Sequence, residues 1–187
     1  MTETKKPDDW FMPYDQVMEQ QVCVWESDGK AANGEPFLSV WKLGHYFFSQ
    51  RAGTDSVAFI LTNEKHWAGL INIYHGPTPD VRDCAFTGSM DMPGKYPIDV
   101  VVAEVKEESG YVVNYWDIEY HGTFEVGTQT NEMVHLYIVN VTEDQKGERE
   151  PDGPHEAAST VVWMKPEEAL QSRDWKAVML AQYLIGR

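Results

Sequence analysis

"IDVVVAEVKEESGY", residues 98–111, narrows the choice of fold more than any other segment of the chain. Its run of valines is typical of a strand, but its flanks favour a helix, because Pro97 suits a first helical turn and Gly110 suits the position after a helix end. The apolar residues recur at the helical spacing i, i+3, i+4 and i+7. They are Ile98, Val101, Val102 and Val105. We therefore predict an amphipathic helix over 98–109.

The same segment carries an acidic stripe beside the apolar one. Glu104, Glu107 and Glu108 are spaced i, i+3 and i+4, so they share one helix face. Like charges at this spacing repel each other by about 0.2–0.5 kcal/mol per pair. Two interpretations stay open on spacing alone. The stripe is a solvated helix face, or it binds magnesium, which takes oxygen ligands from one or two carboxylates and from substrate phosphates.

Short apolar runs separated by turn-forming residues predict strands on both sides of this helix. Two antiparallel pairs are predicted, 21–25 with 37–43 and 56–62 with 67–74. Further strands are predicted at 84–88, 111–126, 132–141 and 160–164. The charged segment 142–158 has no apolar periodicity and is predicted to be a loop.

Two helices are predicted at the C-terminus, a short one from Pro166 and a terminal one over 173–186. Asp174 is the predicted cap of the terminal helix. One face of that helix is predicted to combine Trp175, Val178, Met179 and Gln182. Many strands with a central and a terminal helix indicate an α+β or mixed α/β layer fold.

The chain is strongly acidic. Its 187 residues include 30 Asp and Glu against 15 Lys and Arg, a net charge of -15. This charge gives solubility, and it also repels membranes and long nucleic acids, so a phosphate-bearing substrate would need bound cations. Cys23 and Cys84 lack metal or redox spacing, which fits a reducing compartment, although one disulfide stays open. With no signal core and no long apolar run, we expect a soluble cytoplasmic protein.

Residues 88–111, "GSMDMPGKYPIDVVVAEVKEESGY", resemble the Nudix box, G-x5-E-x7-R-E-U-x-E-E-x-G-U, in which U is a bulky apolar residue. The matching positions are Glu104, Val105, Glu107, Glu108, Gly110 and Tyr111. Ser89, Lys95 and Ala103 stand where the pattern has Gly, Glu and Arg. The entry "TGSMDMPG" is similar to that of sugar-nucleotide pyrophosphatases, some of which also lack the first Glu. Segments 125–139 and 159–170 resemble that branch more weakly.

The resemblance implies an α/β/α sandwich with a mixed sheet over residues 51–187 and a small β segment before it. Residues 1–50 are then a lead-in and a β-hairpin, and residues 20–50 look like the piece that is swapped in homodimers of that branch.

The resemblance also implies a reaction. Nudix hydrolases of this branch use Mg²⁺ or Mn²⁺ to cleave a nucleoside diphosphate sugar, such as ADP-ribose or UDP-glucose, into a nucleoside monophosphate and a sugar phosphate. Glu104 and Glu108 match the strongest metal ligands. Glu107 matches a third ligand or a residue that orients the attacking water. The carbonyl of Gly88 or Ser89 would complete the metal site.

The general base lies after the box in relatives of this kind, in the segment corresponding to 142–158. Its candidates are Glu143, Glu148, Glu150 and Glu156. We favour Glu156, which is closest to the last strand, although each of the four can be a solvated loop charge. Glu132 is a second candidate for the base and for substrate binding.

Substrate contacts are expected from Arg82, where relatives often place phosphate-binding arginines, and from Arg51, near the expected nucleobase. Tyr46, Phe47 and Phe48 can stack on a base or serve as core or dimer contacts. Lys95 can contact a substrate phosphate or lie on the plain surface.

Ala103 keeps a second hypothesis open. It replaces an arginine that pairs with the box glutamates, so the chain can instead be a weakened Nudix-fold protein that senses a nucleotide or binds a partner. A third hypothesis is hydrolysis of a dinucleotide such as NADH or of a capped RNA end. The net charge argues against long RNA.

Overall fold

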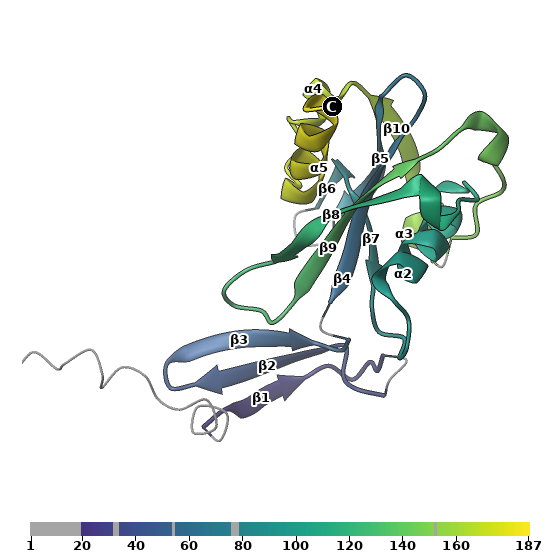
Figure 1. The fold of residues 1–187 in the computed structure, drawn as a ribbon. Coiled ribbons are helices and arrows are strands. Elements are labelled where there is room, and N and C mark those ends of the chain that lie inside the picture. The colour runs from purple at the N-terminus through teal and green to yellow at the C-terminus, as the bar shows by residue number, and fades with distance from the viewer. Residues whose placement is uncertain (1–19, 32–33, 54, 76–78, 152) are drawn as a thin grey trace, which may run out of the picture.

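The computed structural model describes residues 20–31, 34–53, 55–75, 79–151 and 153–187, so the polar lead-in 1–16 lies outside the described residues. The protein has a mixed α+β architecture with a seven-stranded sheet and a three-stranded sheet (Figure 1). The strands of the seven-stranded main sheet are β4 (Ser56–Thr62), β5 (Ala68–His75), β6 (Asp80–Cys84), β7 (Phe86–Ser89), β8 (Ile118–Glu125), β9 (Met133–Asn140) and β10 (Thr160–Met164).

The main sheet opens in its middle. Its order is β10-β5-β4-β9-β8, in which β4 and β9 are parallel and the other pairs are antiparallel. β4 and β5 pair only at Leu61–Gly69 and Thr62–Ala68. Beyond that point β5 pairs with β6 and β4 pairs with β7. Residues 80–89, which include β6 and β7, therefore lie between the diverging strands β4 and β5. The candidate site lies beside these residues.

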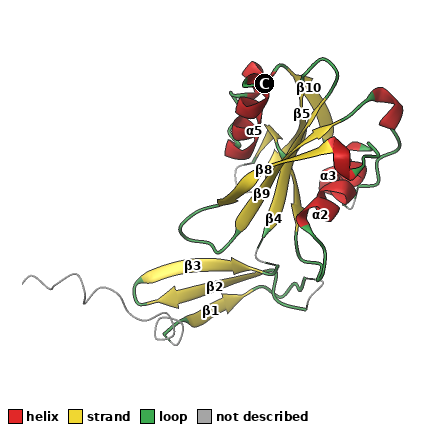
Figure 2. Ribbon diagram, viewed as in Figure 1, coloured by secondary structure: helices red, strands yellow, loops and turns green. Residues whose placement is uncertain are grey.

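The three-stranded sheet consists of β1 (Val22–Glu26), β2 (Leu38–Leu43) and β3 (Tyr46–Arg51), all antiparallel. It lies at one end of the main sheet, as the yellow strands of Figure 2 show. The predicted pairing of 21–25 with 37–43 is confirmed. Ser49 N donates to Gln129 O at 2.8 Å, and Arg51 pairs with Glu132, so β3 is tied to the main sheet.

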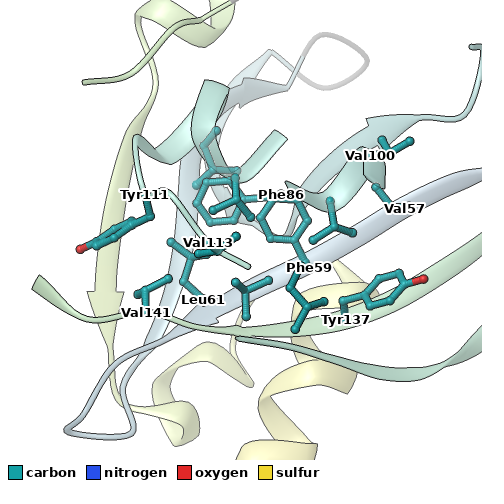
Figure 3. Packing of buried hydrophobic residues seen from close by; sticks show 14 residues of the cluster. Val57, Phe59, Leu61, Phe86, Val100, Tyr111, Val113, Tyr137 and Val141 are labelled. Atoms are coloured by element: carbon teal, nitrogen blue, oxygen red, sulfur yellow. The ribbon is translucent and has the colours of Figure 1, made fainter. Parts of the chain in front are cut away.

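Helices cover both faces of the main sheet, and each face has its own core. On one face, α2 (Pro97–Glu104) packs over a cluster that includes Phe59 and Phe86, whose rings stack with centroids 5.0 Å apart (Figure 3). On the other face lies α5 (Trp175–Ile185). The shorter helices are α3 (Pro154–Ala157) and α4 (Pro166–Ala169).

The predicted central helix is confirmed, but its last turn is wider than an α-helix. Pro97 begins α2, and the Asp99 carboxylate accepts a hydrogen bond from Tyr96 N at 3.0 Å. The chain then continues as a π-helical turn over Val105–Ser109 and ends at Gly110, whose φ of 81° is left-handed. Val101 and Val105 are fully buried, as the apolar stripe predicts.

The terminal helix is also confirmed, but the predicted face is wrong. The Asp174 carboxylate accepts from Lys176 N, as expected for a cap. The buried residues are Ala177, Leu180, Ala181 and Leu184, whereas Gln182 is exposed. Alanines let the helix approach the sheet closely, and a pattern that favours large side chains misses that face.

Three other expectations need correction or completion. The strand predicted at 111–126 begins only at Ile118, because residues before it form a loop and a 3-10 turn at Tyr115–Asp117. The segment predicted as a loop at 142–158 contains α3 and a 3-10 turn at Glu143–Gln145. Cys23 and Cys84 are both free.

The longest described helix, α5, has 11 residues. None of the described helices combines the length and the apolar character that crossing a membrane requires.

Candidate functional site

The acidic stripe is not uniformly solvated. Glu108 is only 5% exposed, and its Oε2 has no hydrogen-bond partner within the described part of the chain. Burial, followed by the neighbouring carboxylates of Glu104 and Glu156, raises the pKa of Glu108 to about 9. Arg149 and a hydrogen bond from the backbone of Thr87 act in the opposite direction and are outweighed. Glu108 is therefore an acid buried among acids, which is typical of functional sites.

Glu104 lies directly over β7. A Cβ atom at Gly88 would come within 2.5 Å of both Cγ and Oε1 of Glu104, so only glycine leaves space for this carboxylate. The predicted metal ligands Gly88 and Glu104 are thus in contact. Glu107, in the π-helical turn, is half-buried.

The end of the helix is held by the loop that follows β9. Gly147 N donates to Gly110 O at 2.7 Å, and Glu150 N donates to Glu107 O at 3.2 Å. Lys106 Nζ also pairs with the Glu150 carboxylate at 2.9 Å. A Cβ atom at Gly110 would lie 2.9 Å from Gly147 O, so this close approach requires glycine. The predicted acidic loop is therefore fixed against the carboxylate stripe.

Arg149 is a site residue that the sequence analysis missed. Its guanidinium donates to Ser159 O at 2.7 Å and to Glu156 O at 3.0 Å, while its buried Nε has no hydrogen-bond partner among the described residues. It also lowers the pKa of Glu108 against the effect of burial. The only signal for it in the sequence is a basic residue inside the acidic run "TEDQKGEREPD".

The four base candidates separate clearly. Glu143, Glu148 and Glu150 are exposed, which fits solvated loop charges. Glu156 is half-buried and close enough to Glu108 to raise its pKa. Glu156 is thus the candidate that the fold brings to Glu104 and Glu108, and these three side chains are defined here as the carboxylate cluster.

Two adjoining hollows lie beside this cluster. The first has a volume of about 270 Å³ and is lined by Arg51, Gly88 and Glu132, among others. The second has a volume of about 390 Å³ and is lined by Arg82 and Glu108, among others. Thr87, Trp175 and Lys176 line both hollows, so the two adjoin.

The predicted substrate residues are each engaged inside the protein. Arg51 donates to the Glu132 carboxylate at 2.9 Å, and Ser56 Oγ donates to the same oxygen at 2.8 Å. Arg82 Nε pairs with Asp80 at 2.8 Å. These contacts fix the direction of the side chains along the walls of the hollows.

The carboxylate oxygens of this site are ligands of the kind that a hard divalent cation prefers, but they are few. Glu104 and Glu108 supply carboxylate oxygens, and Glu108 Oε2 has the unsatisfied acceptor capacity that a cation would use. Among the described residues, no group of three or more His, Cys, Asp or Glu side chains is arranged so that it could hold a metal ion. The residues therefore fit a site in which two carboxylates share a cation with substrate oxygens.

The three departures from the box lie on the surface. Ser89, Lys95 and Ala103 are all exposed, and Ser89 Oγ accepts a hydrogen bond from Arg51 at 3.2 Å. Tyr46 and Phe47 are 44% and 49% exposed on β3, away from the protein core.

No protein-family model matches this chain, and no curated protein matches it either. An assignment of function therefore depends on the geometry of the site and on the resemblance of residues 88–111.

Proposed function

We propose that the protein hydrolyses the diphosphate linkage of a nucleoside diphosphate sugar of the ADP-ribose or UDP-glucose type. The products are a nucleoside monophosphate and a sugar phosphate. The observation that supports this most is the burial of Glu108 with an unpartnered Oε2 beside two other carboxylates. A buried carboxylate oxygen without a hydrogen-bond partner costs folding free energy, and a bound cation would offset that cost.

Glu104 and Glu108 would hold Mg²⁺ or Mn²⁺, with the backbone at Gly88 or Ser89 beside them. A bound cation would neutralise diphosphate charge and lower the pKa of a coordinated water. A chain with a net charge of -15 needs such a cation to approach a diphosphate.

The residues of the chain then have separate roles. Glu107 orients the attacking water, and Glu156 accepts its proton. The oxygen of the water forms a bond to one phosphorus, and the bond from that phosphorus to the bridging oxygen breaks. Arg149 holds the backbone of Glu156 and places its carboxylate near the reacting water. Arg51, Arg82 and Glu132 hold the substrate in the two hollows.

The Nudix sandwich and a homodimer belong to the same proposal. Helices on both faces of a mixed sheet support the sandwich. Exposed apolar residues on the three-stranded sheet support a second copy as the partner, since large exposed apolar groups mark contact surfaces. They include Val22, Val24, Trp25 and Phe47. Sedimentation of wild type and Trp25→Asp should give a dimer and a monomer, and a monomeric wild type would contradict this part.

The test is turnover of ADP-ribose and UDP-glucose in magnesium, followed by phosphorus NMR. A Glu107→Gln/Glu108→Gln variant should release no monophosphate, while Glu167→Gln, an exposed acid on α4, should behave as wild type. Lack of turnover by the wild type in both magnesium and manganese would overturn the proposal for these substrates.

One observation favours a second candidate, a nucleotide-binding or sensor protein without turnover. Position 103 carries an exposed alanine, so no arginine reaches the glutamates from there. Tight binding of a nucleotide sugar that survives intact in magnesium would select this candidate.

A further inference from the structure

The hollow of about 390 Å³ beside Glu108 has the size and lining of a ligand site. Ile71 and Ile73 of β5 form part of its apolar wall, and Trp175 stands at the start of α5. Glu108, with its unpartnered buried Oε2, lines the same hollow. The hollow therefore connects an apolar, aromatic wall to the carboxylate cluster.

The backbone at Trp175 is fixed by the preceding residue, Asp174. The Asp174 carboxylate accepts from Lys176 N at 3.2 Å and from Ala85 N at 2.9 Å, so it joins the start of α5 to the chain between β6 and β7. Trp175 itself is 37% exposed, although a ring of this size is usually more deeply buried. The backbone at Trp175 is thus fixed, and its accessible ring is a suitable platform for stacking.

Basic side chains line this hollow, each of them paired with the carboxylate of Asp80 or Asp174. Arg82, Arg173 and Lys176 all line the hollow. Lys176 Nζ lies 5.8 Å from the centroid of the Trp175 ring and 2.8 Å from the Asp174 carboxylate. A flat aromatic group with an attached phosphate matches both features, because the ring stacks and the phosphate meets the cations.

We propose that this hollow is a nucleobase site, in which the base of the substrate stacks on Trp175 and the adjacent phosphate contacts Lys176 and Arg82. The sugar on the other side of the diphosphate then enters the smaller hollow. Ser56, Ser89 and Glu132 line that hollow with groups that hydrogen-bond to hydroxyls. This inference rests on the proposed function only for the position of the diphosphate at Glu108.

The test measures binding without turnover. AMP, UMP and ribose 5-phosphate are titrated into the protein in EDTA by calorimetry, and the base protons are followed by NMR. Stacking on an aromatic side chain corresponds to roughly 5- to 150-fold in affinity. Trp175→Leu should lower the affinity for AMP and for UMP by a factor in that range. The affinity for ribose 5-phosphate should stay unchanged. Base protons should shift upfield on binding to wild type but not to Trp175→Leu.

Two further variants complete the test. Trp175→Phe keeps an aromatic ring and should retain most of the affinity, and Trp116→Leu, at a site 81% exposed on another part of the surface, should bind as wild type. Equal effects of Trp175→Leu on AMP and ribose 5-phosphate would overturn the base site, and so would the absence of AMP and UMP binding. Because the assay contains no metal, base binding that depends on Trp175 would persist even if the hydrolase proposal failed.

Discussion

The two long helices that cover the main sheet are buried in opposite ways. The four buried residues of α5 are all apolar, and its first turn is capped by Asp174. The end of the central helix buries Glu108 and Ser109, and within the described part of the chain neither Glu108 Oε2 nor Nε of Arg149 in the adjoining loop has a hydrogen-bond partner. The buried face of α5 serves stability, whereas the end of the central helix gives up stability to place an acid. Such local losses are typical of functional sites.

The largest expected effect is a loss of activity when Glu108, at the end of the central helix, is substituted. Glu108→Gln keeps the size of the side chain but removes the charge that would bind a cation. Several kcal/mol of transition-state stabilisation should be lost, which lowers kcat about a thousandfold or more. Glu167→Gln should leave kcat unchanged. A Glu108→Gln variant that turns over at the rate of the wild type would remove the distinction between the helices.

On α5 the expected effect is on stability instead. Leu180 is fully buried against the main sheet, so Leu180→Ala should lower the free energy of unfolding by about 2–5 kcal/mol. Urea denaturation measures this loss. At a temperature where the variant is folded, kcat should stay within about twofold of wild type. A large fall in kcat in the folded variant would show that the buried face of α5 contributes more than stability.

Substitution of Gly110, where the end of the central helix contacts Gly147, should have a smaller effect on the free energy of unfolding. Gly110→Ala forces a side chain into a left-handed conformation, with its Cβ 2.9 Å from Gly147 O. We expect a loss of about 1–3 kcal/mol in unfolding free energy and a lower kcat, because the loop carrying Arg149 must shift. Gly127→Ala, where a Cβ meets nothing within 4 Å, is the control and should change neither quantity.

The last expected effect is gradual, a pH dependence of stability. The pKa of Glu108 is raised to about 9 from 4.5, so the folded metal-free protein keeps a proton that the unfolded chain loses between these values. The contribution of Glu108 is complete below pH 4.5, and it falls as the pH rises toward about 9, by at most about 1.4 kcal/mol per pH unit. Glu108→Gln should remove this slope. Thermal unfolding in EDTA between pH 5 and 9 measures it, and parallel curves for the two proteins would contradict the burial of this acid.

Local patterns were enough to predict many elements of the fold, although β3 and β6 were not predicted. Strands β4 and β10 lie where the apolar runs place them, and Gly110 ends the central helix as predicted. The buried face of α5 was missed because two of its four residues are alanines. The late start of β8 depends on a distant contact, since Tyr111 bridges to Lys146 and Val112 N donates to Gln145 O.

The candidate site was predictable only in part. Spacing alone places Glu104, Glu107 and Glu108 together, but it treats them as equivalent. Which of them is buried depends on the π-helical turn and on the loop that carries Arg149. The approach of Trp175 to Glu108 depends on the opening between β4 and β5, which no local pattern encodes.

Binding of Mn²⁺, followed by electron paramagnetic resonance at pH 8, tests the central claim that Glu108 is buried to hold a cation. Binding must displace a proton from Glu108, so it should tighten as the pH rises from 7 to 9. The account predicts that wild type and Glu167→Gln bind Mn²⁺ alike and that Glu108→Gln binds at least about tenfold more weakly. Equal binding by all three proteins, or no binding by the wild type in the presence of a nucleoside diphosphate, would contradict it.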